Sequence, residues 1–326
     1  MKKKLVPLTK KIKGISITND VGLEVVFSDL GASIYQIKYN DEIMTLTPKN
    51  FKDFVRDDIY YGKTIGPVAN RIKDGLVTIN NQTYQMEKNE GNNTLHSGVL
   101  GLSNRVFAHK IQKKKNYFIV SFTCSNKHLK DGGLPGNIKF NVIYVIKKDE
   151  PILHVSFFAS SDEDTLIHMT NHSYFCLGDK NIDNLYLTIP ADKYIETNKE
   201  DLIPLSEKEI KRCLDFNNKK KIIQDINDKY LQKHRSKGYD HHFIFNTDSP
   251  IITLENDRYK LEIETDFSGV QVYSENYPVD FETLTSEQKI RQGVAIEPQD
   301  SILNRIITRK KPGYYSKFIS YKFSQK

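Results

Sequence analysis

The chain has 326 residues, a formal net charge of +7, 38% hydrophobic residues and no tryptophan. This length allows a large core, and all-β folds of similar size often form one domain, so we expect a single domain over residues 1–326. No apolar run approaches the ~18 residues of a membrane span, so we expect no membrane association. The lysine runs lack the interleaved aromatics of nucleic-acid surfaces, so we expect no nucleic-acid partner.

The amino-terminal residues and the cysteines indicate the compartment. A basic flank at residues 2–4 precedes an apolar run that Pro7 interrupts and Lys10 closes, well short of the ~7–15 apolar residues of a signal peptide. The three cysteines are widely spaced and odd in number, which favours neither a disulfide framework nor a metal knuckle. We therefore expect a cytoplasmic protein.

Alternation of apolar and polar residues with period 2 dominates the chain, and it predicts β-strands. In chain order, we predict strands at residues 23–27, 117–123, 138–147, 152–159, 185–189, 259–264, 270–273 and 315–323. Turn signals rich in Gly, Asn, Asp and Pro occur at residues 80–81, 131–137 and 311–313. The polar, lysine-rich stretch 196–235 is expected to be an excursion between strands, with one or two short helices. Many short strands without helical periodicity favour antiparallel sheets packed as a sandwich or barrel.

Two histidines and a glutamate stand in short, punctuated contexts that are typical of a site. His96 lies in Asn-Thr-Leu-His-Ser-Gly, His172 in Thr-Asn-His-Ser-Tyr-Phe, and Glu297 in Gly-Val-Ala-Ile-Glu-Pro-Gln. Acid/base chemistry near neutral pH needs one group with a proton and one without, and the ordinary pKa values of His (~6.5) and Glu (~4.3) meet that condition. The residues indicate proton transfer.

Further polar residues are suited to holding hydroxyl groups. Asn70 and Arg71 follow a glycine-punctuated segment and offer several hydrogen-bond donors, and Asp240 follows Gly-Tyr and could accept hydroxyl protons. Taken alone, the segment of Arg71 would favour a surface ion pair, and Asp240 could equally be a turn-forming residue. The adjacent His241 and His242 invite a metal hypothesis, but neighbouring residues of a strand point to opposite faces, so we expect no metal.

Taken together, six motifs resemble those of the aldose 1-epimerases, or galactose mutarotases, in order and approximate spacing. They are Asn70-Arg71-Ile72, Leu95-His96-Ser97-Gly98, Thr170-Asn171-His172-Ser173-Tyr174-Phe175, Gly238-Tyr239-Asp240-His241, Gly269-Val270-Gln271-Val272-Tyr273 and Ala295-Ile296-Glu297-Pro298-Gln299. The resemblance covers nearly the whole chain, from about residue 31 to residue 323. It implies an all-β fold, a large twisted antiparallel β-sandwich, with a small-molecule sugar in an open cleft and no cofactor.

The resemblance also implies roles for individual residues. The position of Glu297 is the base that takes the proton from the anomeric hydroxyl, and the position of His172 is the acid that protonates the ring oxygen. His96 matches a second histidine near the ring oxygen, and Asn70, Arg71, Asp240 and Gln271 match residues that hold sugar hydroxyls. The ring opens to an aldehyde, the adjacent C–C bond rotates, and the ring closes as the other anomer.

Some details depart from the family pattern or stay open. Ser97 replaces a usual glycine, Pro67 follows Gly66 where an arginine is common, and residues 300–304 are less regular. We expect a nearby carboxylate, Asp240 or Glu297, to raise the pKa of His172 so that it carries a proton. The preferred aldose and the choice between monomer and homodimer stay open.

Three rival functions remain at this stage. A glycosidase would need two carboxylates flanking the scissile bond, and a histidine in the acid position speaks against it. A non-catalytic sugar-binding or sugar-sensing protein of the same fold could retain the cleft. A relative that acts on a hexose phosphate or a disaccharide is also compatible with the motifs.

Overall fold

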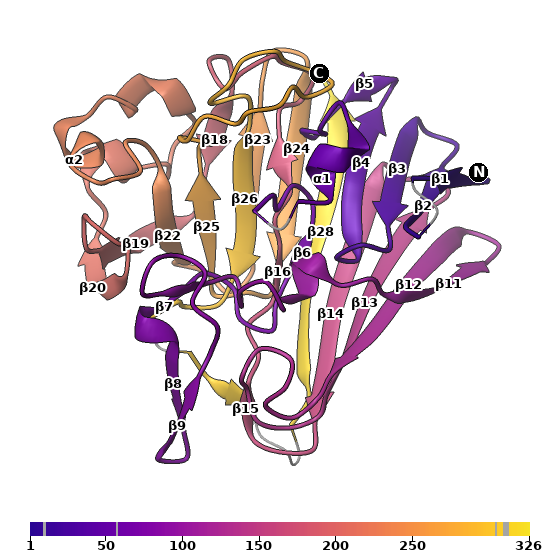
Figure 1. The fold of residues 1–326 in the computed structure, drawn as a ribbon. Coiled ribbons are helices and arrows are strands. Elements are labelled where there is room, and N and C mark those ends of the chain that lie inside the picture. Colours follow the sequence, from indigo (N-terminus) through magenta and orange to yellow (C-terminus); the bar gives the residue numbers. More distant parts are fainter. Residues whose placement is uncertain (9–10, 57, 304, 309–312) are drawn as a thin grey trace.

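In the computed structural model, described for residues 1–8, 11–56, 58–303, 305–308 and 313–326, antiparallel sheets dominate the chain (Figure 1). The predicted all-β sandwich class is therefore confirmed. Each predicted strand is present, with ends that differ by at most a few residues from the predicted ends. Of the turn predicted at residues 311–313, the first two residues lie outside the described part of the chain.

The largest sheet has nine strands in antiparallel order and contains most of the strands that alternation predicts. In spatial order they are β11 (Ala108–Lys113), β12 (Tyr117–Asn126), β13 (Ile138–Lys147), β14 (Ile152–Ser161), β28 (Tyr315–Gln325), β24 (Tyr259–Thr265), β23 (Ile251–Glu255), β18 (Tyr186–Thr188) and β21 (Lys220–Lys221). The carboxy-terminal strand β28 lies in its middle, between β14 and β24.

A six-stranded and a five-stranded sheet accompany it. The six-stranded sheet consists, in spatial order, of β17 (Tyr174–Phe175), β26 (Val294–Gln299), β25 (Gly269–Tyr273), β22 (Asp240–Phe245), β19 (Ala191–Thr197) and β20 (Pro204–Glu209). The five-stranded sheet follows chain order, with β1 (Lys2–Pro7), β2 (Lys13–Thr18), β3 (Leu23–Ser28), β4 (Ser33–Tyr39) and β5 (Glu42–Ile43).

Short two-stranded ladders tie loop segments together. The pairs are β7 (Arg71–Ile72) with β10 (Thr94–Leu95), β6 (Thr64–Ile65) with β16 (Thr170–Asn171), β15 (Thr165–Leu166) with β27 (Ile307–Thr308), and β8 (Leu76–Ile79) with β9 (Gln82–Gln85). The first two pairs join segments that carry Arg71, His96 and His172. They therefore bring motifs that are far apart in the sequence to one place.

The helices are short. They are α1 (Phe51–Phe54), α2 (Lys229–Gln232) and the 3₁₀ turns η1 (Lys73–Gly75), η2 (Leu102–Asn104), η3 (Arg212–Leu214) and η4 (Ile222–Asp225). The excursion predicted at residues 196–235 contains one short α-helix, α2, as expected, and also the 3₁₀ turns η3 and η4. It further contains the edge strand β20, which pairs with β19, and β21, which pairs with β18. Among the described residues, no helix is long and apolar enough to cross a membrane.

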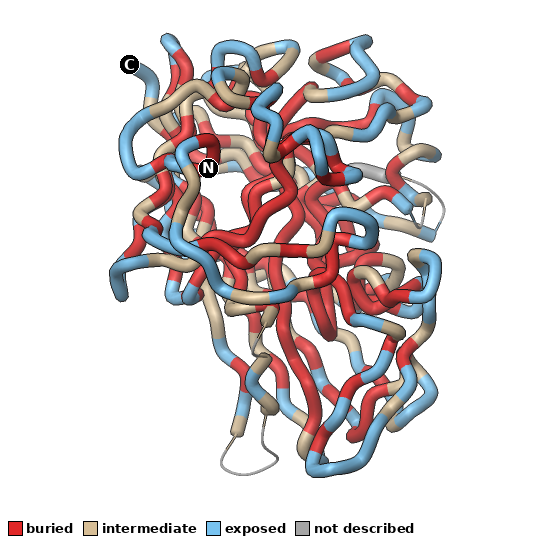
Figure 2. Tube along the Cα trace, turned by 90° about the vertical axis from the view of Figure 1, so that its left-hand side faces the viewer, coloured by how far each residue is buried: buried red, intermediate tan, exposed pale blue. Residues whose placement is uncertain are grey.

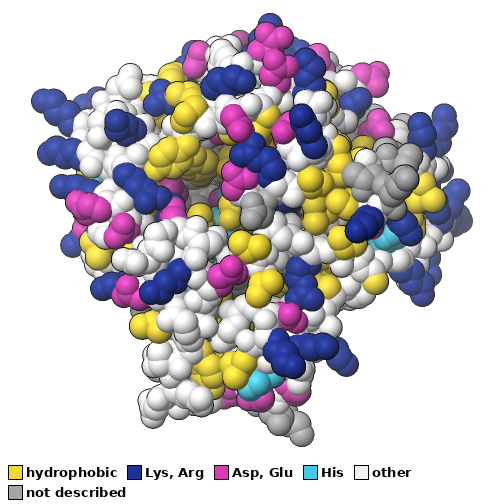
Figure 3. All heavy atoms as spheres, in the orientation of Figure 1, with side chains coloured by type: hydrophobic (Ala, Val, Ile, Leu, Met, Phe, Trp, Pro, Cys, Tyr) yellow, Lys and Arg dark blue, Asp and Glu magenta, His cyan; other side chains and the backbone are white. Residues whose placement is uncertain are grey.

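The core lies between the sheets. Along β13, Phe140, Val142 and Tyr144 are buried and alternate with more exposed residues, as a half-buried strand requires. One cluster of buried side chains combines residues from all three sheets, including Val25, Val142 and Val272. Figure 2 shows that the buried stretches of the chain gather in the interior. Charged side chains are spread over the surface. Figure 3, in the orientation of Figure 1, shows that this face of the molecule is hollowed near its centre.

Candidate active site

The register of three neighbouring strands assembles one wall of the site. Gln271 on β25 lies between His242 on β22 and Glu297 on β26, and the next pair on the same face is Asp240 with Tyr273. Because alternate residues of a strand share a face, Asp240, Gln271, Tyr273 and Glu297 point to the same side. They line a pocket of about 530 Å³.

The other walls come from the tied loops. Asn70, Arg71, His96 and His172 line the same pocket, together with Tyr60. The structure thus brings together every residue that the sequence predicted for the site. The ladder between β6 and β16 and the ladder between β7 and β10 make this possible, since each fixes one histidine motif to the segment around residues 64–72.

The proposed acid and base face each other. His172 Nε2 lies 3.4 Å from Glu297 Oε1, and the two residues are only 4% and 2% exposed. Within the described part of the chain, His172 Nδ1 and Glu297 Oε2 have no hydrogen-bond partner. Buried polar atoms normally have partners, so these atoms are suited to contacts with a ligand.

Burial shifts both groups toward their neutral forms. It lowers the pKa of His172 to about 3. It also raises the pKa of Glu297 well above its ordinary value, and the charge of Asp240 adds to that rise while Arg71 opposes it. The expectation that a carboxylate raises the pKa of His172 is therefore wrong, because burial lowers this pKa and the contribution that opposes burial is a backbone hydrogen bond. A protonated Glu297 beside a neutral His172 nevertheless holds one proton in all, which is the same number as in the ion pair of ionised Glu297 and protonated His172.

His96 is held as a neutral hydrogen-bond donor. Its Nδ1 accepts a hydrogen bond of 3.2 Å from the backbone N–H of Asn70, which leaves the ring hydrogen on Nε2. Burial lowers its pKa well below the ordinary value, and the neighbouring His172 and Arg71 act in the same direction. The His96 and His172 rings lie 5.3 Å apart, edge to face, and Tyr60 contacts both rings.

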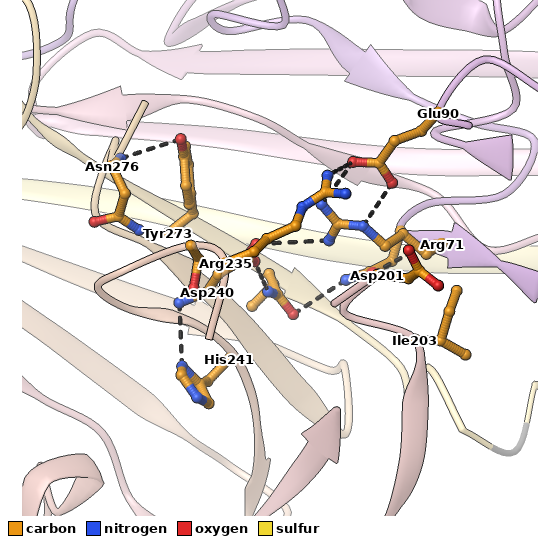
Figure 4. A network of polar contacts seen from close by, with 12 residues as sticks. Arg71, Glu90, Asp201, Ile203, Arg235, Asp240, His241, Tyr273 and Asn276 are labelled. Carbon is orange, nitrogen blue, oxygen red and sulfur yellow. Dashed lines mark hydrogen bonds and ion pairs between the residues drawn. The ribbon is translucent and has the colours of Figure 1, made fainter. Parts of the chain in front are cut away.

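A chain of hydrogen bonds orients the residues predicted to hold hydroxyls. Asn70 Nδ2 donates to Gln271 Oε1 at 3.1 Å, and Gln271 Nε2 donates to Asp240 Oδ1 at 2.6 Å. Arg71 Nη1 lies 3.5 Å from Asp240 Oδ2 (Figure 4). Asn70 has a positive φ of 65°, and its Oδ1 accepts the backbone N–H of Arg71, which fits the tolerance of Asn for this conformation.

Several residues of the pocket were missed by the sequence reasoning. Glu90 binds Arg71 with two hydrogen bonds of 2.7 and 3.0 Å, and Tyr60, Tyr61 and Glu275 line the pocket. Burial raises the pKa of Glu275 to about 7, against hydrogen bonds from Tyr61 and the backbone that lower it. For Glu90, the turn sequence Glu-Gly-Asn-Asn just before the His96 motif was an available signal.

The structure explains the residue at Ser97, one of the departures from the family pattern, and shows the contacts of Asp300, which begins another. Ser97 has a φ of 71°, in the left-handed region that favours glycine, but its hydroxyl accepts the N–H of Val68 and donates to the carbonyl of Val68, at 2.8 and 2.9 Å. Asp300 accepts hydrogen bonds from Ser268 and Lys317. Asn304 lies outside the described residues.

The adjacent histidines lie on opposite sides of β22, as predicted. His241 packs near Tyr194, Tyr230 and His234, away from the pocket. Within the described ranges, no group of three or more His, Cys, Asp or Glu side chains is arranged to hold a metal ion.

Comparison with known proteins decides the family, because a sequence model described as aldose 1-epimerase matches residues 13–310. The chain belongs to the aldose 1-epimerase family. Aldose 1-epimerases are isomerases, and the chain is 30% identical over 303 residues to the aldose 1-epimerase of Haemophilus influenzae, covering 87% of this chain and 85% of that protein. It is 29% identical over 236 residues to pig galactose mutarotase, covering 69% of this chain and 65% of the pig protein.

Solved structures share the fold of this aldose 1-epimerase family member. The galactose 1-epimerase from Lactobacillus acidophilus NCFM superposes with a TM-score of 0.90 at 24% identity, over 100% of this chain and 99% of the other. An aldose epimerase homologue from C. elegans superposes with a TM-score of 0.81 at 23% identity, over 99% of both chains.

Proposed function

We propose that this protein interconverts the α and β anomers of a free aldose of the glucose and galactose class, as a single catalytic domain without a cofactor. The observation that carries the proposal is the contact of 3.4 Å between His172 and Glu297 in a pocket that also contains Asn70, Arg71, Asp240 and Gln271. The substrates of the relatives named above support the substrate class.

In the proposed reaction, ionised Glu297 takes the proton of the anomeric hydroxyl and protonated His172 gives its proton to the ring oxygen. The C1–O5 bond breaks as the C1 carbonyl forms, which yields the open-chain aldehyde. Glu297 is then protonated and His172 is neutral. Rotation about C1–C2 presents the other carbonyl face, and the two proton transfers run in reverse.

Burial makes the ion pair the minor form of the resting pair, and it favours the ring-opening step that starts from this form. Before opening, the two buried groups carry opposite charges, and after opening both are neutral. Burial raises the pKa of Glu297 and lowers that of His172, so it stabilises the proton arrangement that accompanies the aldehyde. Each positioned acid or base contributes about 10²–10⁴-fold, so the pair is sufficient for a reaction that already proceeds in water.

The charge of the pocket favours a neutral sugar over a hexose phosphate. Its two arginines, Arg56 and Arg71, are each bound to carboxylates, Arg56 to Asp58 and Asp280 and Arg71 to Glu90. A phosphate would therefore have to displace a carboxylate to reach a guanidinium. Glu275 and Glu297 add further carboxyl groups to the lining.

Polarimetry tests the proposal. Freshly dissolved α-D-glucose, α-D-galactose, α-D-glucose 6-phosphate and maltose are followed with and without the purified protein. We expect the protein to accelerate mutarotation of a free hexose, and to be least effective with the phosphate. Binding of a hexose by calorimetry without any acceleration would instead identify a sugar-binding protein.

A further inference from the structure

A cluster of alternating charges runs from the rim into the pocket and supports Arg71. It comprises Arg235, Glu90, Arg71 and Asp240, in that order of contact (Figure 4), and we refer to it as the arginine clamp. Arg235 Nη2 lies 2.5 Å from Glu90 Oε1, and Glu90 in turn binds Arg71. The clamp joins segments 145 residues apart in the chain.

The geometry of Glu90 fixes the rotation of the Arg71 guanidinium. Glu90 Oε2 accepts from Nε at 2.7 Å and Oε1 accepts from Nη2 at 3.0 Å, which is the bidentate arrangement of a carboxylate with an arginine fork. This contact uses one edge of the fork. The opposite group, Nη1, is thereby directed toward Asp240, where both side chains line the pocket.

Charge balance shows why the support matters. Arg71 is 8% exposed, and a buried guanidinium needs compensating charge. Asp240 and Glu90 raise the pKa of Arg71 and together offset the lowering by burial. Without Glu90, the only remaining carboxylate in contact with Arg71 among the described residues is Asp240. The guanidinium would then close on Asp240 and occupy oxygens that otherwise accept sugar hydroxyls.

We propose that Glu90, braced by Arg235, is a positioning residue that holds Arg71 in the orientation for binding the hydroxyls of the sugar. This inference rests on the proposed function of the same pocket. Arg235 acts through Glu90 and belongs to a different segment, whose backbone N–H at Arg235 donates to the carbonyl of Lys199 at 3.0 Å. The clamp therefore also connects the loops around residues 90, 199 and 235 at the rim.

The consequence is a selective effect on binding. Hydroxyls distant from the reacting atoms are held alike in the ground state and the transition state, so their loss raises KM and leaves kcat nearly unchanged. We expect Glu90→Gln to raise KM about tenfold with kcat within about twofold of the parent. Arg235→Met is expected to raise KM by about two- to fourfold, because it removes only the brace.

The experiment compares four variants with the parent by polarimetry on α-D-galactose and by calorimetric titration with D-galactose. They are Glu90→Gln, Arg235→Met, the double variant and the control Glu42→Gln. Glu42 forms an ion pair of 3.0 Å with Arg258, and neither of these two residues lines the pocket. The double variant should have the KM of Glu90→Gln alone, since Arg235 acts through Glu90. Glu42→Gln should match the parent.

Salt provides a readout that a purely structural role would not move. The side chain of Arg235 is 39% exposed, so 1 M KCl should screen its contact with Glu90 and raise the KM of the parent toward that of Arg235→Met. The KM of Arg235→Met should respond less to the same salt. Should Glu90→Gln fail to fold, as judged by its melting temperature, Arg235→Met and its salt response decide the question.

The outcomes separate this inference from the proposed function. A parent without mutarotase activity refutes the proposed reaction, and the calorimetric Kd values then test the clamp alone. A folded Glu90→Gln variant with the KM and Kd of the parent overturns the inference. The inference is also overturned if Glu90→Gln and Arg235→Met lower kcat by the same factor and leave KM unchanged. It is likewise overturned if the rise in KM of the double variant equals the product of the rises in the two single variants.

Discussion

Replacing Glu297 by Gln should lower activity and raise stability at the same time. The amide keeps the shape of the side chain but cannot take the anomeric proton, so kcat should fall by at least ~10²-fold, while the Kd for the sugar changes less. Stability responds because the raised pKa of Glu297 reflects an unfavourable burial of its charge.

The sign of the stability effect follows from proton binding. Because the pKa of Glu297 is higher in the folded protein than in the unfolded chain, the folded protein binds more protons above about pH 4, and the free energy of unfolding falls as pH rises through this range. The Gln variant lacks this penalty. A pKa that is one unit higher in the folded protein costs about 1.4 kcal/mol at high pH, so the variant should melt at least roughly 2 °C above the parent at pH 8.

The assay combines polarimetry on α-D-galactose with thermal melts at pH 4 and pH 8. At pH 4, where the carboxyl group is largely protonated in both states, the two melting temperatures should converge. Equal mutarotation rates of variant and parent would remove Glu297 from the mechanism. A variant that melts below the parent at pH 8 would refute the reasoning from burial.

Three further predictions concern the same site. His172→Gln should reduce kcat about as strongly as Glu297→Gln. Because the two residues act as a unit, the double variant should lose less kcat, measured by polarimetry, than the product of the two single losses; a loss equal to that product would mean that the residues act independently. The pH profile of kcat/KM should be a bell whose basic limb follows Glu297, because Glu297 has the higher pKa of the pair. Asp240→Asn should move this basic limb to lower pH, because Asp240 raises the pKa of Glu297; an unmoved limb would contradict this coupling. Ser97→Ala should lower the free energy of unfolding by about 2–4 kcal/mol in denaturant titrations, and Ser97→Gly by less, because glycine relieves the positive φ; equal losses would mean that the backbone is unstrained.

Much of the fold was predictable because its strands are half-buried. In β13 and β24, buried residues alternate with more exposed ones because one face of each strand packs on the core. This burial selects apolar residues at every second position, and that alternation is visible in the sequence. β20 escaped prediction because it is an edge strand. Its residues, Pro204–Glu209, are mostly exposed, so burial imposes no clear alternation on them.

The site was predictable only where a motif marks it. His96, His172 and Glu297 stand in contexts dense with Gly, Asn and Pro, and the structure brings all three to one pocket. Arg235 carries no such mark, and the Gly and Asn residues after Glu90 do not reveal its partners, because the contact of the two residues joins segments 145 residues apart. The direction of the pKa shift at His172 was also beyond the sequence, since it depends on how completely the pair is buried.

The structure divides the pocket into two electrostatic halves with different tasks. In the binding half, Arg71 lies between Glu90 and Asp240, so its charge is compensated and it can present donors without a strong field on the reacting pair. Asp240 and Arg71 indeed act in opposite directions on the pKa of Glu297. In the proposed reacting half, His172 and Glu297 contact each other at 3.4 Å, and burial is the largest cause of both pKa shifts, with Asp240 and Arg71 as smaller, opposing causes at Glu297. Changes at Asp240 or Arg71 would therefore alter both hydroxyl binding and the pKa of the base.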